Sequence, residues 1–423
     1  MKTYSKYLKY ILIFGDILFF YLSLYITIYT RYGFNIEIFK QHFIGFSFIL
    51  PFWIIAFYSN NFYSLNILKN KFFLRLIKSF IIGFVFSIIF FYFSPQLKIT
   101  PKTNLFLFSF IYLAIFIIYR NLFENKFLNK RKIKILVIIP KNILEKFKQD
   151  FEGLVIYNFT FYDHNSMYDD FSKFDLIVIS HKIFNQDQNL INHVIKKINY
   201  QVPIIELIDF YEKNLGRIPL EELDEYWILK EIINPEFRFQ SLIKRTLDIL
   251  LALGVGIICL FLLPIIALAI YLNSPGPIIF RQKRVGKNNK EFTIYKFRTM
   301  KNIPDLGIWE KQNDERIFFV GKILRKLHLD ELPQVINILI GELSFVGPRP
   351  EQATIVNKLE KQIPFYNLRH LISPGITGWT QVNYKKPYNL EETKIKIEYD
   401  LYYLKNRNIF LDLLIILKTV FNL

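Results

Sequence analysis

The chain has 423 residues, of which 52% are apolar and 18% aromatic, and its formal net charge is +18. This length is enough for two or three domains, and the apolar fraction is too high for an ordinary soluble protein, so part of the chain is expected in a membrane. The charge could indicate nucleic-acid binding, but no zinc-finger, RNP or basic-zipper pattern occurs, and basic residues beside membrane segments explain it more simply. The single cysteine, Cys259, excludes a disulfide framework and a cysteine-rich metal site.

Four long apolar runs lie near the start of the chain, and runs of about 20 such residues can cross a bilayer as helices. Lys and Arg accumulate on the cytoplasmic side of short connections. Here they precede the first run, separate the second from the third, and follow the fourth, so residues 1–132 are predicted to form a four-helix transmembrane domain with both ends in the cytoplasm. The runs are Tyr10–Tyr29, Phe43–Tyr58, Leu76–Phe93 and Leu105–Tyr119, and the basic residues are Lys2, Lys6, Lys9, Lys69, Lys71, Arg75, Lys78, Arg120, Lys126, Lys130, Arg131, Lys132 and Lys134.

The next segment, residues 133–228, alternates between short β-branched runs and polar helical stretches, which is typical of a parallel sheet with crossover helices. The runs that predict strands are Ile135–Ile139, Leu176–Ile179 and Pro203–Leu207. A dinucleotide-binding domain would have G-x-G-x-x-G after the first strand, but the sequence there is IIPKNILEKF. We therefore predict a degenerate Rossmann-like α/β domain with a regulatory or assembly role, followed by a linker at residues 229–241, and we disfavour an NAD-dependent oxidoreductase.

The last predicted domain, residues 242–423, opens with an apolar stretch, residues 248–272, that is long enough to span a membrane. Pro264 lies inside this stretch, and proline removes a helix hydrogen bond and clashes with the preceding turn. The basic residues before the stretch and the Lys- and Arg-rich residues 280–326 after it should both stay in the cytoplasm. We therefore favour a re-entrant helix-break-helix at residues 245–272 over a kinked transmembrane helix.

One acidic residue, Asp248, lies at the entrance of this stretch. A lone charge near lipid costs a few kcal/mol. The nearest bases, Lys244 and Arg245, precede it by about one helical turn. We expect Asp248 to pair with one of them.

The run RKLHLDELPQ sets Asp330 and Glu331 ahead of Pro333 and an apolar helical pattern. Structurally, this predicts a helix start with Asp330 as the N-cap and Pro333 in the first turn. A chemical interpretation is that the positive end of the helix holds a carboxylate ionised, where it could attack the phosphorus of a bound phosphate, while Glu331 suits Mg²⁺. Ammonium and guanidinium groups bind phosphate oxygens, and four lie in nearby motifs: Lys296, Arg298, Arg325 and Arg349.

From Ile243 to the C-terminus the chain resembles the bacterial sugar transferases, also called polyprenyl-phosphate hexose-1-phosphate transferases or monotopic phosphoglycosyl transferases. The blocks that carry the resemblance are KRTLDILLAL, SPGPIIFRQKRVGKNNKEFTIYKFRTM, LRKLHLDELPQVINILIGELSFVGPRPE, PGITGWTQVNY and EYDLYYLKN. The apolar runs and the α/β segment, including DFYEKNLGRIPLEELDEYWIL, are similar to the large subclass of that family. His328 departs from the family pattern, which more often has a small polar residue such as Ser there.

The resemblance implies a two-step transfer at the cytoplasmic face of the bacterial inner membrane. Asp330 would attack the sugar-bearing phosphate of a nucleotide sugar, usually a UDP-sugar, and release UMP. Undecaprenyl phosphate would then displace Asp330, giving the undecaprenyl-diphospho-sugar that starts an exopolysaccharide, O-antigen or capsule glycan. The resemblance also implies Glu331 as the ligand of Mg²⁺, membrane lipid as a partner, a homodimer, no nucleic acid, and phosphate-holding roles for Lys296, Arg298, Arg325 and Arg349.

Two other interpretations stay open at this point. Asp330 could act as a base in a direct transfer within a ternary complex, with no covalent intermediate. The chain could also be a non-catalytic transporter or assembly scaffold, because it has four apolar runs. Charges that line a pathway would favour transport, but these runs contain mainly Asp16.

Overall fold

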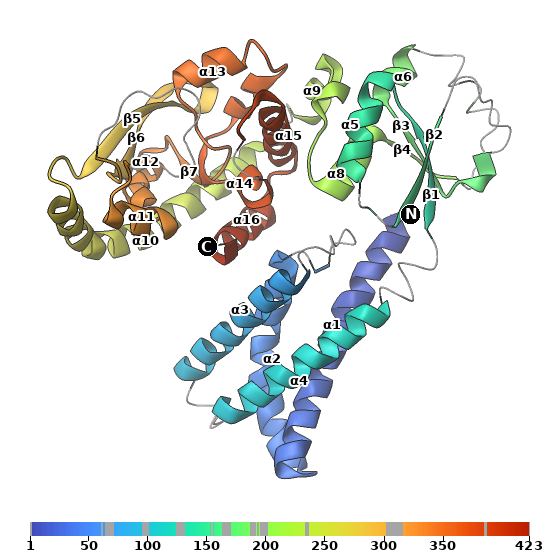
Figure 1. Cartoon of the computed structure of the whole chain (residues 1–423), viewed down its shortest axis with the longest axis vertical. Coiled ribbons are helices and arrows are strands. Elements are labelled where there is room, and N and C mark those ends of the chain that lie inside the picture. Colours follow the sequence, from blue (N-terminus) through green and yellow to red (C-terminus); the bar gives the residue numbers. More distant parts are fainter. Residues whose placement is uncertain are drawn as a thin grey trace. The chain divides into compact units, whose positions relative to one another are not determined.

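The computed structural model describes residues 2–60, 62–63, 72–94, 101–123, 132–152, 154, 156–162, 171–186, 192, 194, 202–232, 237–301, 316–384 and 387–422. The chain separates into two compact units, Met1–Phe210 and Tyr211–Leu423, and Figure 1 shows the elements of each. This division lies earlier in the chain than the end of the α/β domain predicted at residue 228. Five basic residues used for the predicted orientation lie outside the described residues: Lys69, Lys71, Lys126, Lys130 and Arg131.

The first unit begins with four helices: α1 (Lys2–Tyr32), α2 (Ile36–Ser59), α3 (Phe72–Phe93) and α4 (Pro101–Phe123). They cover the four predicted apolar runs, and each is long and apolar enough to cross a membrane. Helix α1 packs along α4, and α2 packs along α3 (Figure 1). The bundle core is mainly aromatic and includes Phe20, Phe46, Trp53, Phe57, Phe108 and Tyr112.

The bundle contains a buried ion pair that corrects one detail of the sequence analysis. Arg120, counted there as a residue of a cytoplasmic connection, lies inside α4 because this helix continues to Phe123. Its Nη2 is 2.6 Å from Oδ2 of Asp16 on α1, and its Nη1 donates to the carbonyl of Phe62 at 3.0 Å. The acid that could have lined a pathway is therefore neutralised by a cation inside the bundle.

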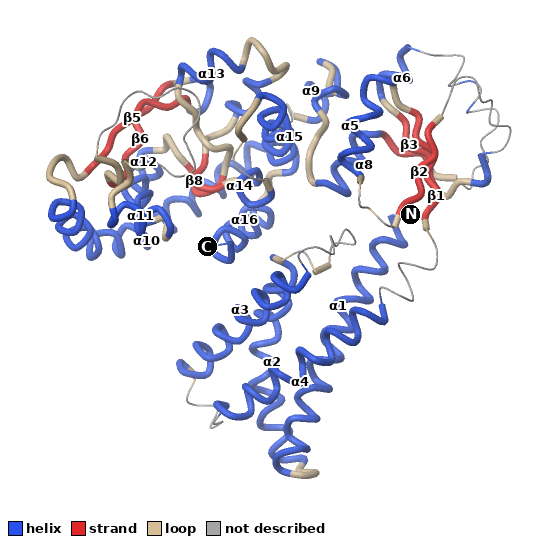
Figure 2. Tube along the Cα trace, viewed as in Figure 1, coloured by secondary structure: helices blue, strands red, loops and turns tan. Residues whose placement is uncertain are grey.

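The first unit also contains the predicted parallel sheet, which appears in red in Figure 2. Its strands pair in the order β2-β1-β3-β4, and all three pairings are parallel. Helix α5 starts directly after Pro140, so the segment after β1 has no glycine-rich loop, as its sequence indicates. The elements are β1 (Ile133–Ile138), α5 (Lys141–Phe151), β2 (Tyr157–Phe161), η4 (Phe171–Lys173), β3 (Leu176–Ile179), α6 (His181–Gln186), β4 (Ile204–Glu206) and α8 (Leu207–Leu215), which continues past the boundary of the unit.

The second unit is mainly helical, with two short two-stranded sheets (Figure 2). Strands β5 and β6 form an antiparallel hairpin, and β7 and β8 pair in parallel. The elements are η5 (Leu220–Glu222), α9 (Glu225–Glu231), α10 (Phe237–Asn273), β5 (Ile279–Val285), η6 (Lys287–Asn289), β6 (Glu291–Phe297), α11 (Phe319–Lys326), η7 (Leu329–Gln334), α12 (Val335–Ile340), β7 (Ser344–Val346), α13 (Ala353–Leu359), η8 (Tyr366–Leu371), β8 (Gly375–Thr377), α14 (Trp379–Asn383), α15 (Leu390–Asn406) and α16 (Ile409–Asn422).

Helix α10 differs from the predicted helix-break-helix, because it is one helix of 37 residues that continues through Pro264. Leu262 and Ile266, on either side of this proline, pack in the same apolar cluster. Proline interrupts only part of the helical hydrogen bonding, and we infer that this packing keeps the helix continuous. Both halves of α10 pack against other elements of the second unit. Ala252 lies in one apolar cluster of that unit, and Ile270 lies in another.

The start of α10 corrects the expected partner of Asp248. Its Oδ1 accepts a hydrogen bond from the backbone N–H of Phe345 at 3.1 Å. Lys244 pairs instead with Asp412 at 2.7 Å, and Arg245 donates to backbone carbonyls of α12. The two bases are thus engaged by α16 and α12, elements far away in the sequence.

Candidate active site

Three of the predicted site residues meet at one carboxylate. Lys296 comes from β6, Glu331 from η7, and Arg349 from the loop between β7 and α13. Nζ of Lys296 is 2.8 Å from Oε1 of Glu331, and Nη2 of Arg349 is 3.0 Å from the same oxygen. Asp330 precedes Glu331 in the chain, and both acids are only 8% exposed. The structure therefore assembles a buried acid pair with two cations from separate elements.

The backbone around the acid pair differs from the predicted helix start. Asp330 and Glu331 lie inside the 3₁₀ turn η7, which begins after His328, and Asp330 caps no helix. Helix α12 starts later, at Val335. His328 has a φ of 53°, an uncommon left-handed conformation for a residue other than glycine. Leu327 and His328 form a turn between α11 and η7, so the acids come directly after this turn.

Burial and the neighbouring charges give the two acids opposite pKa shifts. Burial alone would raise the pKa of Glu331, but the charges of Arg349 and Lys296 lower it to about 2. Burial raises the pKa of Asp330 above its ordinary value, and Lys296 and Arg325 oppose this only in part. This direction is opposite to the shift that a helix N-terminus would give, and the ionised state of Asp330 near neutral pH stays a prediction. Burial outweighs the nearby cations because none of them forms a hydrogen bond with its carboxylate in the described chain.

The carboxylate of Asp330 has no partner among the side chains and backbone groups that the structure describes. It makes no hydrogen bond or ion pair with any residue that the structure describes, whereas both cations hold Oε1 of Glu331. A poorly hydrated carboxylate with unused lone pairs is a good nucleophile once it is ionised. The geometry thus distinguishes the two acids, because cations hold Glu331 while Asp330 has no such partner among the described residues.

The acid pair fits Mg²⁺ by its donor chemistry. Oε2 of Glu331 has no protein partner in the part of the chain that the structure describes, so it can serve as a hard oxygen ligand. Within that part, no group of three or more His, Cys, Asp or Glu side chains could hold a metal ion by itself. Mg²⁺ is usually held by one or two carboxylates together with substrate phosphates and water, rather than by a complete protein cage. Glu331 is suited to this kind of site.

The two remaining predicted cations are placed differently. Nε of Arg325 donates to Oγ1 of Thr299 at 2.8 Å, and its charge acts on Asp330. The guanidinium of Arg298 instead donates to the backbone carbonyls of Ser274 and, at 3.2 Å, Pro275. Arg298 therefore holds the chain just after α10, and it forms no hydrogen bond or ion pair with Asp330 or Glu331.

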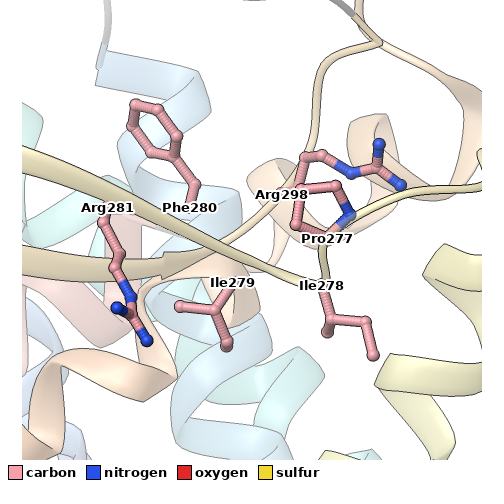
Figure 3. Close-up of a pocket in the computed structure, with 6 residues that line it drawn as sticks. All are labelled: Pro277, Ile278, Ile279, Phe280, Arg281 and Arg298. Atoms are coloured by element: carbon pink, nitrogen blue, oxygen red, sulfur yellow. The ribbon is translucent and has the colours of Figure 1, made fainter.

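A pocket of about 580 Å³ lies beside Arg298. Figure 3 shows the guanidinium groups of Arg281 and Arg298 on different sides of the pocket, pointing away from each other. The pocket excludes both acids, and we do not assign the reaction to it. Its lining residues are Pro277, Ile278, Ile279, Phe280, Arg281 and Arg298.

A largely buried carboxylate, with its side chain 13% exposed, follows Arg349 closely and was missed by the sequence analysis. Glu351 pairs with Lys396 of α15, and Oε2 of Glu351 accepts from the hydroxyl of Tyr366 at 2.9 Å. Burial alone would raise the pKa of Glu351, but Lys396 and Arg369 lower it to about 2. This pairing fixes the end of the loop that carries Arg349.

Arg369 holds the same loop by its backbone. This side chain is 1% exposed, and its Nη2 donates to the carbonyl of Arg349 at 2.9 Å. Its Nε donates to Oδ2 of Asp400 on α15 at 3.0 Å. The four-residue spacing of Lys396 and Asp400 on one helix is a sequence signal that could have indicated this network, but α15 carries many other charged residues that mask it.

A buried amide aligns β6 with the acid pair. Asn337 of α12 is fully buried, its Nδ2 donates to the carbonyl of Thr293 at 2.7 Å, and its Oδ1 accepts from the N–H of Tyr295 at 3.3 Å. These bonds fix the strand that carries Lys296 beside the segment that carries Glu331. The sequence analysis missed this residue, because one Asn in an apolar helix gives no clear signal.

Comparisons with known proteins identify relatives of this chain. A family model described as "Bacterial sugar transferase" matches residues 239–423, which include the acid pair. The UDP-N-acetylgalactosamine-undecaprenyl-phosphate N-acetylgalactosaminephosphotransferase of Aeromonas hydrophila is 44% identical over 223 residues, 52% of this chain and 52% of the relative. The UDP-glucose:undecaprenyl-phosphate glucose-1-phosphate transferase of Escherichia coli (strain K12) is 36% identical over 236 residues, 54% of this chain and 51% of the relative.

These two matches span about half the length of each relative. The exopolysaccharide production protein PSS of Rhizobium leguminosarum bv. phaseoli is covered almost completely. It is 39% identical over 186 residues, which are 42% of this chain and 93% of the relative. With the family model and this relative in agreement, the chain belongs to the bacterial sugar transferase family.

Proposed function

We propose that this chain transfers a sugar 1-phosphate from a UDP-sugar to undecaprenyl phosphate, releases UMP, and so starts the synthesis of a surface glycan. The observation that carries the proposal is the buried acid pair, in which cations hold Glu331 while Asp330 has no hydrogen-bond or ion-pair partner among the described residues. The printed names of the relatives from Aeromonas hydrophila and Escherichia coli describe transfers of this kind.

The first step uses Asp330 as a nucleophile. One of its carboxylate oxygens attacks the phosphorus that bears the sugar, the bond from this phosphorus to the bridging oxygen breaks, and UMP leaves with that oxygen. In the second step an oxygen of undecaprenyl phosphate attacks the same phosphorus and expels the carboxylate. Covalent catalysis of this kind divides one difficult displacement into two easier ones.

The surrounding residues hold charge during both steps. Lys296, Arg325 and Arg349 offset the negative charge of the phosphates, which is the main task of a protein in phosphoryl transfer. Glu331 would hold Mg²⁺, which when bound neutralises part of the charge of the diphosphate. Lys296 and Arg349 keep this carboxylate ionised and oriented. Arg298 enters the proposal as an anchor of α10, since its geometry gives no support for a contact with phosphate.

The reaction is proposed to take place at the cytoplasmic face of the inner membrane, with α1 to α4 crossing it. Helix α10 is proposed to enter one leaflet without crossing. Both halves of α10 pack against other elements of the second unit. If α10 crossed the membrane, part of the rest of this unit would have to lie in or beyond the lipid. Much of its remaining surface is apolar and exposed, including Leu260 (75%), Phe261 (72%) and Leu272 (74%). Such a surface suits lipid.

The test uses the purified full chain with Mg²⁺, a panel of UDP-sugars and undecaprenyl phosphate, and it measures UMP release. Without the lipid, labelled UMP should exchange into the UDP-sugar, and a sugar-phosphate adduct should form on Asp330. Asp330→Asn should remove both signals. Glu391→Gln is the control, because this glutamate side chain is 75% exposed on α15 and should keep both.

Each alternative has its own result. Turnover with lipid but no exchange without it would favour direct transfer with Asp330 as a base. Exchange that persists in Asp330→Asn would rule this residue out as the nucleophile. No UMP release from any UDP-sugar would contradict the proposed transfer itself and favour a non-catalytic role.

A further inference from the structure

Residues Tyr211–Leu223, here called the strap, precede the residues that the family model matches. They nevertheless belong to the second unit and to its buried part. Ile218 is fully buried, and Leu220 and Leu223 are 5% and 4% exposed. A linker that only connects two domains would stay at the surface, whereas the strap buries its apolar side chains.

The strap surrounds one buried carboxylate of α15, that of Glu398. Nη1 of Arg217 is 3.0 Å from Oε2 of Glu398, and the two side chains are 6% and 0% exposed. The backbone N–H of Leu220 donates to Oε1 at 3.3 Å, and the N–H of Ile218 donates to the carbonyl of Glu398 at 3.1 Å. A buried carboxylate that loses its cation is strongly destabilising, so this arrangement fixes the strap on α15.

A second contact joins the strap to α14. Nε1 of Trp379 donates to the carbonyl of Gly216 at 2.7 Å. Gly216 has a φ of +63°, and a Cβ there would lie 3.0 Å from the ring of Trp379. Any other residue at this position would meet both backbone strain and the indole. The ring of Trp379 also stacks on Tyr402 of α15, with centroids 5.4 Å apart.

The position of Glu398 on α15 links the strap to the candidate active site. Lys396 and Asp400 lie four residues apart and so share one face of the helix, while Glu398, midway between them, points to the opposite face. The shared face holds the loop that carries Arg349, through the pairs Lys396–Glu351 and Asp400–Arg369. The strap thus clamps α15 on one side, and the site loop is fixed to the other.

We propose that the strap positions α15, so that Arg349 meets Glu331, and that Arg217 is therefore a positioning residue for the transfer. The proposal rests on the proposed function for its kinetic consequence. Its structural consequence, a fixed loop at residues 347–351, is independent of the reaction. The inference also makes the catalytic domain of this chain begin at the strap rather than at residue 242.

The experiment compares full-length variants. Arg217→Met removes the cation, Arg217→Lys keeps it, and Arg217→Met with Glu398→Gln removes both charges. Arg407→Met is the matched control, because this arginine lies just after α15 and its Nη1 donates to the carbonyl of Leu404 in that helix. Two readouts are measured: kcat and KM for UMP release with undecaprenyl phosphate, and amide hydrogen exchange of Gly347, Arg349 and Glu351.

Arg217→Met should lower kcat by about 10- to 100-fold with little change in the KM for the lipid, because a small misplacement of a catalytic group costs rate. Exchange at the three amides should accelerate. Arg217→Lys should restore part of both readouts, and the double variant should be less impaired than Arg217→Met, since no unpaired charge stays buried. Arg407→Met should match the unchanged protein.

Several results would overturn the proposal. The first is that Arg217→Met has the same kcat and the same amide exchange as the unchanged protein. The second is that its kcat is lower while amide exchange at residues 347–351 is unchanged. If Arg217→Met fails to fold, kcat and amide exchange are compared between Arg217→Lys and Arg407→Met instead. An Arg217→Lys variant that matches the unchanged protein in both readouts argues against a positioning role. If the unchanged protein releases no UMP, the proposed function fails, while the exchange data still test the strap.

Discussion

Replacing Glu351 by glutamine is expected to destabilise the second unit by about 3 kcal/mol near neutral pH. The pKa of Glu351 lies at about 2 instead of its ordinary 4.5, because Lys396 and Arg369 outweigh the effect of burial. A tenfold change in a proton-binding constant corresponds to about 1.4 kcal/mol, so this difference amounts to about 3 kcal/mol. Burial lowers the pKa of Lys396, and this destabilisation of its charged form offsets part of the stabilisation that Glu351 provides. Glutamine keeps the shape and removes the charge.

The pH dependence of this effect has a definite sign. A carboxyl group whose folded pKa is lowered stabilises the fold above its unfolded pKa, and this contribution disappears as the pH falls through the folded pKa. The difference in free energy of unfolding between Glu351→Gln and the unchanged protein should therefore be at its maximum above about pH 5. It should decrease as the pH falls from 4.5 toward 2.

The assay is thermal unfolding of the full chain in detergent, followed by tryptophan fluorescence. For a domain of this size, 1 kcal/mol shifts the midpoint by about 2–4 °C, so the expected decrease is roughly 6–12 °C. Glu391→Gln, at an exposed position on the same helix as Lys396, should change stability by less than about 0.5 kcal/mol. An unchanged midpoint in Glu351→Gln, or a decrease that is as large near pH 3 as near pH 7, would refute the reasoning.

Three further predictions concern other charges. Arg298→Lys should lower the free energy of unfolding of the second unit by about 2 kcal/mol, because an ammonium group cannot bond to both carbonyls that the guanidinium holds. Calorimetry would measure this loss as a lower thermal midpoint. Asp16→Leu should destabilise the bundle by about 3–5 kcal/mol by leaving Arg120 buried alone, and Asp16→Leu with Arg120→Leu should recover most of this in thermal unfolding in detergent. The rate of UMP exchange should fall as the pH is lowered, because only the ionised form of Asp330 attacks. The midpoint of this fall should lie above 3.8, the ordinary pKa of an aspartate, because burial raises the pKa of Asp330.

The candidate site could be predicted in part because its residues stand in dense local motifs. Asp330 and Glu331 are adjacent, and the motifs with Lys296 and Arg349 are rich in residues that bind phosphate. The roles within the motifs were less predictable. Lys296 and Arg298 are separated by one residue, yet one contacts the acid pair and the other holds the end of α10. Which carbonyl or carboxylate a long cationic side chain reaches depends on elements that are distant in the sequence.

The sequence by itself determined the four apolar helices, the parallel sheet without a phosphate loop, and the acid pair. Each of these depends on a local pattern: the length of an apolar run, the alternation of β-branched and polar segments, or a short motif. Tertiary structure alone decided that Arg120 neutralises Asp16, that α10 stays continuous through Pro264, and that the strap belongs with α15. These outcomes depend on packing and on the pairing of buried charges across many residues, and no local pattern encodes which partner a buried charge will find.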